Sequence, residues 1–374
     1  MSRLYLVADD LTGALDSTAA FCRELGPVPV FLGASPENGP GHAAAVDLAT
    51  RDADATSAVQ ANLSVLRQLT TADVAFKKID SLLRGHWAVE LAALLRSGSF
   101  RTCVLAPAFP AQGRVTVQGR QVVHTSETSS YIVDVDPGAR LRQLGLKVHC
   151  VSDLGTTAHS ALDDATIDVV LADAASDESL RAIAGWGAQR PRPILWCGSA
   201  GLARALAQAG EPPQVGPVRR PVLAIVGTDH AVSTAQVARA AASNPECVVV
   251  ADVDLAVSAA RIAQALSRVG HCVLTFALPI GTPPDEAARS IRSRLAALLP
   301  QITRPSTLVV TGGETLLSVC QGLGATHLQV DGEFSPGVPH STLCAGRWHG
   351  IDAVSKSGAF GAADWLSDLL AAAH

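Results

Sequence analysis

The stretch LYLVADDLTGALDSTAAFCRELGPVPVFL, residues 4–32, contains the pattern that decides the fold class. An apolar run at residues 4–8 predicts a strand, and a segment with helical spacing follows it and is closed by Gly26. Residues 28–32 then predict a second strand. Strand, helix and strand in this order form the βαβ unit of a parallel sheet, so we expect an α/β protein.

The same rhythm continues along the chain. Further strands are expected at residues 44–49, 74–78, 102–107, 147–151, 167–172 and 194–198, and then at 222–227, 247–253, 272–278, 307–313, 327–332 and 351–358. Between the two series, residues 211–221 (EPPQVGPVRRP) have the composition of a linker. We therefore expect two α/β domains, residues 1–212 and 220–374. Each would be a parallel or mixed sheet flanked by helices, with an active-site cleft between the domains.

The composition excludes several classes of protein. The 374 residues are 48% hydrophobic, which is enough for a folded core, and the net charge of -5 offers no basic surface for nucleic acid. Asp9 and Asp10 stand where a signal peptide needs apolar residues, and no apolar run is long enough to span a membrane. The eight cysteines form no CxxC pair and suit a reducing compartment, so we expect a cytoplasmic protein.

Asp9 and Asp10 directly follow the first predicted strand. Ligands of open α/β sheets bind at the carboxyl ends of strands, so polar side chains at this place are the first candidates for function. A carboxylate here can accept a proton from an alcohol, as a general base does. Asp is also favoured as the cap of the helix that begins here, and the sequence leaves both roles open.

The segment KKIDSLLRGHWAVE, residues 77–90, places a second polar cluster at a strand end. Its members are Lys78, Asp80, Ser81 and Arg84. Cations bind a carboxylate and Asp binds hydroxyls, so the cluster suits a polyhydroxy carboxylate. A solvated turn with a capping Asp or Ser is the alternative.

Two glycine-containing segments follow strands in the second half of the chain, TGGETLLSV at residues 311–319 and SKSGAFG at residues 355–361. Glycines let backbone N–H groups approach a phosphate, and the N-terminus of the following helix adds a favourable dipole. The GK[ST] of a P-loop and the GxGxxG spacing are both absent, so neither standard nucleotide fingerprint is met. The glycines of these two segments could serve phosphate binding or close packing, and the sequence leaves both interpretations open.

Two more segments carry no clear chemistry. Residues 106–119 (APAFPAQGRVTVQG) predict a rigid loop that carries Arg114, and residues 198–208 (GSAGLARALAQ) favour close packing of a helix on the sheet. The sequence contains no HExxH, CxxC or histidine cluster for zinc and no GxSxG of an α/β-hydrolase.

Taken in order, the blocks ADDLTGALD, KKIDSLLRG, PAFPAQGRVTVQG, GSAGLA, TGGETLLSV and SKSGAFG resemble the four-carbon acid sugar kinase family. They span residues 8–361. The resemblance implies an N-terminal domain that binds a four-carbon sugar acid, such as threonate, erythronate or a 3-oxo-tetronate, and a C-terminal domain that binds ATP. Transfer of the γ-phosphoryl group to the terminal hydroxyl would give a 4-phosphate.

The resemblance also implies which residues bind each ligand. The acid would contact Asp10, Arg51, Lys78, Ile79, Asp80 and Ser81, and the nucleotide would contact Gly312, Gly313, Glu314, Thr315, Ser355, Lys356, Ser357 and Gly358. The family's GSxS loop after the first C-terminal strand stands here as Gly227 to His230, so that His230 replaces a nucleotide-contacting serine.

These assignments give a working mechanism. Asp10 would act as base or would orient the hydroxyl, Lys78 and Arg51 would bind the carboxylate of the acid, and Asp80 would complete the catalytic group. Mg²⁺ would bridge the phosphates of ATP, although no ligands for it can be named. A homodimer is left open, and an NAD-dependent oxidoreductase and a non-catalytic sugar-acid sensor are the rival functions.

Overall fold

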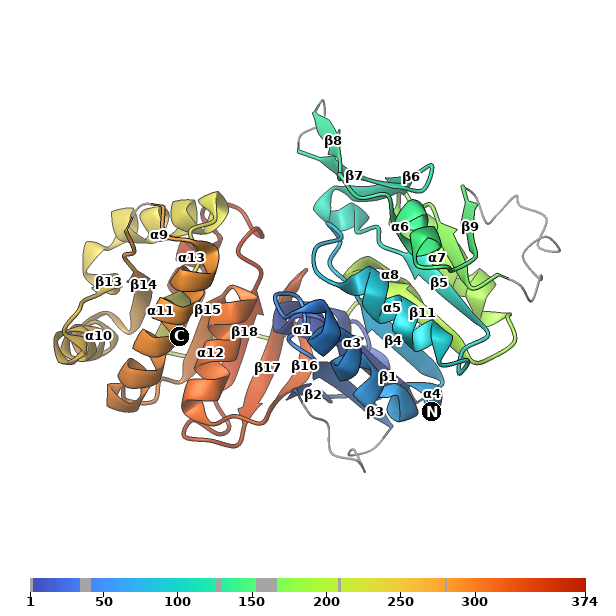
Figure 1. Ribbon diagram of the computed structural model, residues 1–374. Helices are drawn as coiled ribbons and strands as arrows, with labels where there is room; N and C mark the ends of the chain where they lie inside the picture. Colours follow the sequence, from blue (N-terminus) through green and yellow to red (C-terminus); the bar gives the residue numbers. More distant parts are fainter. Residues whose placement is uncertain (1–2, 34–41, 126–128, 153–166, 208–209, 280) are drawn as a thin grey trace. The chain divides into compact units, whose positions relative to one another are not determined.

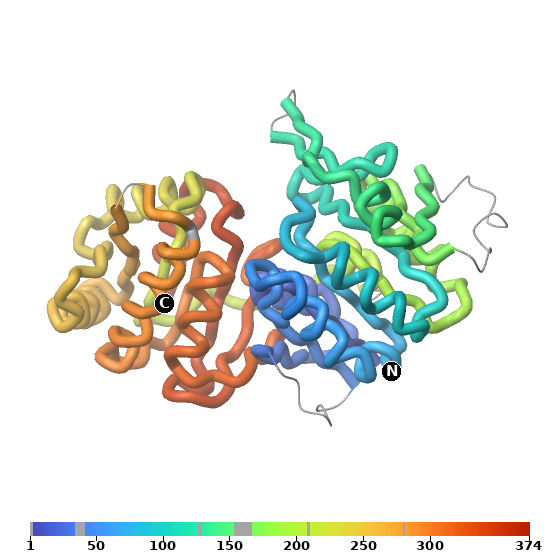
Figure 2. The backbone as a smooth tube through the Cα atoms, viewed as in Figure 1, coloured from blue at the N-terminus to red at the C-terminus, as the bar shows by residue number. Residues whose placement is uncertain are grey.

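The computed structural model describes residues 3–33, 42–125, 129–152, 167–207, 210–279 and 281–374. It contains two compact units, Met1–Pro212 (unit 1) and Pro213–His374 (unit 2). Both are α/β structures, as the sequence predicts (Figure 1). Figure 2 follows the backbone of unit 1 from blue to yellow-green and that of unit 2 from yellow to red.

The described part of unit 1 is built on eight parallel strands in the order β2-β3-β1-β4-β11-β5-β10-β9. Their bounds are β1 Leu4–Ala8, β2 Val28–Leu32, β3 Ala43–Asp47, β4 Val74–Lys78, β5 Thr102–Ala106, β9 Val148–Val151, β10 Val169–Ala172 and β11 Ile194–Gly198. Strands β1 and β11 are buried along their whole length. Parallel strands covered on both faces are continuous apolar runs, which is why the sequence shows them clearly.

The helices of unit 1 pack in two groups, in which α8 contacts α1 and α7 while α5 contacts α3 and α6. Their bounds are α1 Leu11–Ala19, α2 Cys22–Leu25, α3 Ala55–Ser64, α4 Leu66–Thr70, α5 Trp87–Arg96, α6 Pro137–Gln143, α7 Asp177–Ala188 and α8 Ala200–Leu206. The prediction of a single helix before Gly26 is wrong in one respect, because the helical segment is broken after Ala19. Gly26 does close α2, with a φ of +73° that suits glycine.

A small antiparallel sheet is inserted after β5. It consists of β6 (Arg114–Val117), β7 (Arg120–His124) and β8 (Ser130–Ile132). The expectation of a loop that carries Arg114 is therefore wrong, because Arg114 begins a strand. Four-residue runs that mix polar and apolar residues give too weak a period to be identified from sequence.

The described strands of unit 2 have the order β13-β14-β12-β15-β18-β17-β16. The first five are parallel, β17 runs antiparallel to β18, and β16 runs antiparallel to β17. They are β12 Val222–Val226, β13 Val248–Ala251, β14 His271–Phe276, β15 Thr307–Thr311, β16 His327–Ser335, β17 Val338–Cys344 and β18 Asp352–Lys356. The helices are α9 Ala231–Ser243, α10 Leu255–Val269, α11 Pro284–Leu298, α12 Gly313–Leu323 and α13 Trp365–Ala372. The sequence did not predict β17, which contains Pro339 and alternates buried with half-buried residues.

Each unit has its own hydrophobic core. Leu91, Leu105 and Leu195 are fully buried in the core of unit 1, and Val222 and Leu369 are buried in that of unit 2. In the described part of the chain, no helix combines the length and the apolar character that a membrane span requires.

Candidate active site

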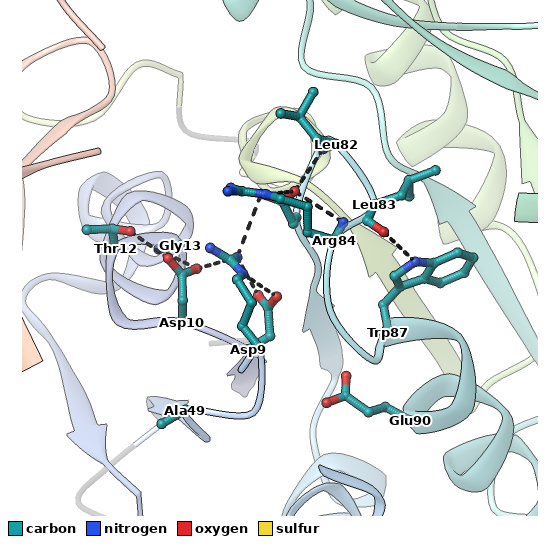
Figure 3. Close-up of polar contacts among 12 residues, drawn as sticks. Asp9, Asp10, Thr12, Gly13, Ala49, Leu82, Leu83, Arg84, Trp87 and Glu90 are labelled. Atoms are coloured by element: carbon teal, nitrogen blue, oxygen red, sulfur yellow. Dashed lines mark hydrogen bonds and ion pairs between the residues drawn. The ribbon is translucent and has the colours of Figure 1, made fainter. Parts of the chain in front are cut away.

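The candidate site of unit 1 lies at the carboxyl ends of β1 and β4, which are neighbours in the sheet. Asp9 follows β1, and Asp10 is the N-cap of α1 (Figure 3). The Asp10 carboxylate accepts hydrogen bonds from the Gly13 N–H at 3.1 Å and from the Thr12 hydroxyl at 2.6 Å. Asp10 therefore does have the capping role that the sequence left open.

Arg51 joins the carboxylates of this site. Its Nε and Nη2 donate to both oxygens of Asp9 at 2.8 and 2.9 Å, and Nη2 also donates to Asp10 at 2.7 Å. The same nitrogen lies 3.8 Å from Asp80. Burial alone would lower the pKa of Arg51, but the three carboxylates raise it above its usual value. Arg51 is thus a permanent cation that holds the acidic residues together.

The neighbouring carboxylates of Asp9 and Asp10 are shifted in opposite directions. Burial raises the pKa of Asp9, and the charge of Arg51 offsets this only in part. Burial also acts to raise the pKa of Asp10, but the charges of Arg51 and Lys78 hold it below its usual value. Asp10 is therefore an ionised hydrogen-bond acceptor at neutral pH.

Asp80 organises the turn that follows β4. Its carboxylate accepts hydrogen bonds from the Leu82 N–H at 3.1 Å and from Nε and Nη2 of Arg84, each at 2.9 Å. Burial acts to raise the pKa of Asp80, but the hydrogen bond from Arg84 and the charge of Arg51 hold it well below its usual range. The side chain of Arg84 is 61% exposed. The turn is therefore held by hydrogen bonds to Asp80 and still presents a charge that a ligand can reach.

Two residues beside these loops have a left-handed backbone. Ala49 has a φ of +50° and Leu83 a φ of +60°. Such conformations cost on the order of 1 kcal/mol each for residues other than glycine, and they collect at functional sites. Hydrogen bonds hold both in place. The Ala49 N–H donates to Asp47 at 2.9 Å. The Leu83 carbonyl accepts from Trp87 Nε1 at 3.1 Å, as Figure 3 shows.

Lys78 ends β4 and is almost completely buried. Gly13 makes room for it, because a Cβ at Gly13 would lie only 2.6 Å from Lys78 Nζ and 2.5 Å from Asp10 Oδ1. Lys78 Nζ and Asp10 Oδ1 are therefore neighbours. No described residue makes a hydrogen bond or an ion pair with Lys78, so its ammonium is a donor available to a ligand.

Ser81 and Ile79 lie in the same turn in different environments. The Ser81 hydroxyl accepts a hydrogen bond from Arg114 Nη1 at 2.5 Å. The Ile79 side chain is fully buried in the core, and its N–H donates to the Gly198 carbonyl at 2.9 Å. Of the polar groups of Ile79, its carbonyl oxygen is left for the substrate contact that the resemblance implies.

In unit 2, three loops meet at the carboxyl ends of β12, β15 and β18. A Cβ at Gly227 would lie 2.4 Å from the Thr315 hydroxyl, and one at Gly358 would lie 3.0 Å from Thr228. Gly312 has a φ of +100° and donates its N–H to the Lys356 carbonyl at 2.9 Å. The glycines are therefore needed for the close approach of these loops.

A cavity of about 640 Å³ opens beside these loops. It is lined by Thr228 and Asp229 after β12, by the last residues of β14 and the segment after it (Thr275 to Pro279), and by Glu314 and Thr315 in the first turn of α12. The other residues predicted to bind the nucleotide are not among its lining: His230, Gly312, Gly313, Ser355, Lys356, Ser357 and Gly358. The segment after β14 was missed, although the rule that ligands bind at strand ends would have indicated it.

His230 and Lys356 both make hydrogen bonds with residues close to them in sequence. His230 is exposed and caps α9, with Nδ1 accepting from the Val232 N–H at 3.3 Å. Lys356 is buried, donates to the Ser357 carbonyl at 3.1 Å and lies 5.4 Å from the centre of the Trp365 ring. Burial lowers the pKa of Lys356 to about 8.

The described residues contain no cluster of three or more side chains that could by itself hold a metal ion. Asp229 and Glu314 nevertheless line the same cavity as the hydroxyls of Thr228 and Thr315. Oxygen donors of this kind suit Mg²⁺, which commonly takes one or two carboxylates together with phosphate oxygens.

Comparisons with known proteins place these two sites in context. A model for a sugar-binding N-terminal domain matches residues 4–206, and a model for a nucleotide-binding C-terminal domain matches residues 223–366. The D-threonate kinase of Cupriavidus necator is 30% identical, over 95% of this chain and 94% of that protein. The D-erythronate kinase of Heliobacterium modesticaldum is 26% identical, over 97% and 95% of the two chains.

The fold has a counterpart among solved structures. A Haemophilus influenzae protein of a family without assigned function matches with a TM-score of 0.72 at 20% identity, over 98% of this chain and 99% of that one. This likeness concerns the fold alone. The two domain models and the full-length relatives, taken together, show that the chain is a phosphotransferase that belongs to the four-carbon acid sugar kinase family.

Proposed function

We propose that the protein transfers the γ-phosphoryl group of ATP to the terminal hydroxyl of a four-carbon sugar acid, giving the 4-phosphate and ADP. Threonate, erythronate and 3-oxo-tetronates form the substrate class. The observation that carries the proposal is the juxtaposition of Lys78 and Asp10 in the unit that matches the sugar-binding model. A buried ammonium that makes no hydrogen bond with the described residues stands there beside an ionised carboxylate.

Lys78 and Asp10 suit a single hydroxyl group. The hydroxyl would donate to the Asp10 carboxylate and accept from the Lys78 ammonium, so each protein group would gain a hydrogen bond. Arg51 donates from Nε and Nη2 to carboxylates of the protein. We therefore propose that it holds Asp10 in place, in addition to any contact with the acid. Asp80, which accepts a hydrogen bond from Arg84, is the third carboxylate of this group.

The reaction makes modest demands on a base. The bond between the γ-phosphorus and its bridging oxygen to ADP breaks, the hydroxyl oxygen bonds to the phosphorus, and the hydroxyl proton passes to Asp10. Transition states of this type are loose, so the proton leaves late and an acceptor with a lowered pKa is adequate. Catalysis then rests on the alignment of the hydroxyl and on the charge of Lys78 near the transferred group.

ATP would bind in the cavity of unit 2. Its volume of about 640 Å³ is in the ordinary range for a site of this kind. The N-terminus of α12 favours phosphate there, and the hydroxyl of Thr315 in its first turn is a further donor. Asp229 and Glu314 would hold Mg²⁺, which supplies charge neutralisation to the bound phosphates.

The test is an ATP-consumption assay with a panel of four-carbon acids of defined stereochemistry, followed by identification of the product. We expect one or a few acids to support turnover and to yield a 4-phosphate. Absence of turnover with every acid, or phosphate on another carbon, would contradict the proposal.

We further propose a cytoplasmic location. None of the eight cysteines, all of which lie in described segments, forms a disulfide, and six of them are buried. Thiols in this number persist most readily in a reducing compartment. Fractionation of the native host would test this.

A further inference from the structure

The proposed reaction requires a second group of donors in unit 1. Lys78 and Asp10 are neighbours and can serve one oxygen-bearing carbon of the acid. The carboxylate lies at the other end of the four-carbon chain, separated from the terminal hydroxyl carbon by two carbons. A charged carboxylate in a half-buried site needs cationic or hydroxyl donors of its own.

Arg114 lies beside the turn after β4 that carries Ser81, although it comes from a separate part of the fold. It begins β6 in the small antiparallel sheet, 33 residues after Ser81, and its Nη1 donates to the Ser81 hydroxyl at 2.5 Å. Burial lowers the pKa of Arg114, and the charges of Asp80 and Arg84 act on it in opposite directions. Its guanidinium therefore lies within electrostatic reach of the same turn.

The contact also determines how Ser81 can behave. A hydroxyl that accepts a hydrogen bond from a guanidinium directs its own hydrogen elsewhere. Ser81 and Arg114 can then act as adjacent donors, the first through its O–H group and the second through its guanidinium. Adjacent donors in this geometry suit the two oxygens of a carboxylate.

The small sheet holds this pair rigidly through Gln121 of β7. The Gln121 side chain is fully buried and donates from Nε2 to the Ser81 carbonyl at 2.9 Å and to the Pro107 carbonyl at 3.3 Å. Its oxygen accepts from the Thr116 hydroxyl at 2.8 Å. A buried amide with every contact satisfied fixes the strand that carries Arg114 against the loop that carries Ser81.

The far end of the β6–β7 hairpin is fixed as well. The N–H groups of Gln118 and Gly119 donate to the Asp173 carboxylate at 2.5 and 2.8 Å. Thr116 exchanges backbone hydrogen bonds with Ala174. The hairpin is therefore bonded to the end of β10 at one side and to the turn that carries Ser81 at the other. A precise ligand contact needs such support.

We propose that Arg114, together with Ser81, binds the carboxylate of the sugar acid, and that the small sheet β6–β7–β8 is the element that selects acids over neutral polyols. This inference rests on the proposed function. Arg114 is a binding residue in it, and Gln121 is a positioning residue that acts through Ser81.

The test compares Arg114→Met with a matched control, Arg120→Met. Arg120 lies on the same hairpin, but its partner is Asp136, at 3.3 Å, and both side chains are about 40% exposed. Calorimetry would measure binding of a tetronate and of its neutral amide to each full-length protein. Loss of a charge-assisted contact should weaken tetronate binding by Arg114→Met about tenfold to a hundredfold. Amide binding should change less than threefold, and Arg120→Met should bind both ligands as the wild type does.

Unchanged tetronate binding by Arg114→Met would overturn the assignment, as would an equal loss for acid and amide. Arg114→Lys serves if the methionine variant does not fold, because it keeps the charge and loses the fork, and it should bind the acid with intermediate affinity. Wild-type protein that binds a tetronate but consumes no ATP would contradict the proposed kinase reaction and leave the Arg114 assignment standing.

Discussion

At the scale of one residue, Asp10 has a structural role in the fold and a chemical role in the proposed reaction. It caps α1, accepts from Thr12 and is paired with Arg51. We expect Asp10→Asn to lower kcat by about a hundredfold or more, since a positioned acceptor contributes that much, while asparagine still caps the helix. Steady-state kinetics and thermal unfolding would measure both effects. Turnover comparable to that of the wild type would remove Asp10 from the mechanism.

Gly13 offers a test in which stability and activity should separate. Alanine favours a helix over glycine by up to about 1 kcal/mol, but a Cβ at Gly13 would displace the ends of Lys78 and Asp10. We expect Gly13→Ala to remain folded and to lower kcat/KM for the acid at least tenfold.

Gly185 is the matched control for this change. It lies in α7, where a Cβ would meet no atom within 4 Å. Gly185→Ala should raise stability slightly and leave kinetics unchanged. Equal activity of the two alanine variants would show that the space beside Lys78 is not needed.

At the scale of the element, β18 carries a buried lysine whose titration affects folding. The pKa of Lys356 is lowered from 10.5 to about 8 in the folded protein. Between these values the unfolded chain binds more protons than the folded one, so this residue makes stability rise with pH from about 8 to about 10.5. Below pH 8 the full cost of the buried ammonium remains.

Lys356→Met should remove this dependence. Urea unfolding at pH 8, 9 and 10 would compare the two proteins, and the advantage of the variant should shrink by on the order of 1 kcal/mol per pH unit. A constant difference between the proteins across this range would mean that Lys356 titrates normally.

Elements differed in how far the sequence could predict them. Buried parallel strands such as β1 appear as apolar runs, whereas β6 and β17 mix polar and apolar residues and were missed. The site shows the same division. Asp10 and Lys78 could be predicted as site residues because they stand at the ends of strands, but the bond between Arg114 and Ser81 joins residues 33 positions apart and gives no local signal.

At the scale of the molecule, each unit has its own core and its own candidate site. We expect a tetronate to slow amide hydrogen exchange in residues 9–13 and 78–84, and ATP with Mg²⁺ to slow it in residues 227–229 and 313–318. Exchange measured by mass spectrometry with each ligand alone would show this. Protection of residues 78–84 by ATP alone would reverse the assignment of ligands to units.

The left-handed backbone of Ala49 has a consequence for attempts to make this enzyme more heat-resistant. Leu83 is excluded from such attempts, because its side chain is buried in the core of unit 1 and a glycine there would leave a cavity. Ala49 is exposed, so its replacement with glycine relieves a strained backbone without a cavity, and a screen for survival after heating would reward the change. The same change would loosen the segment that leads to Arg51, so variants selected for heat resistance at this position should be slower catalysts.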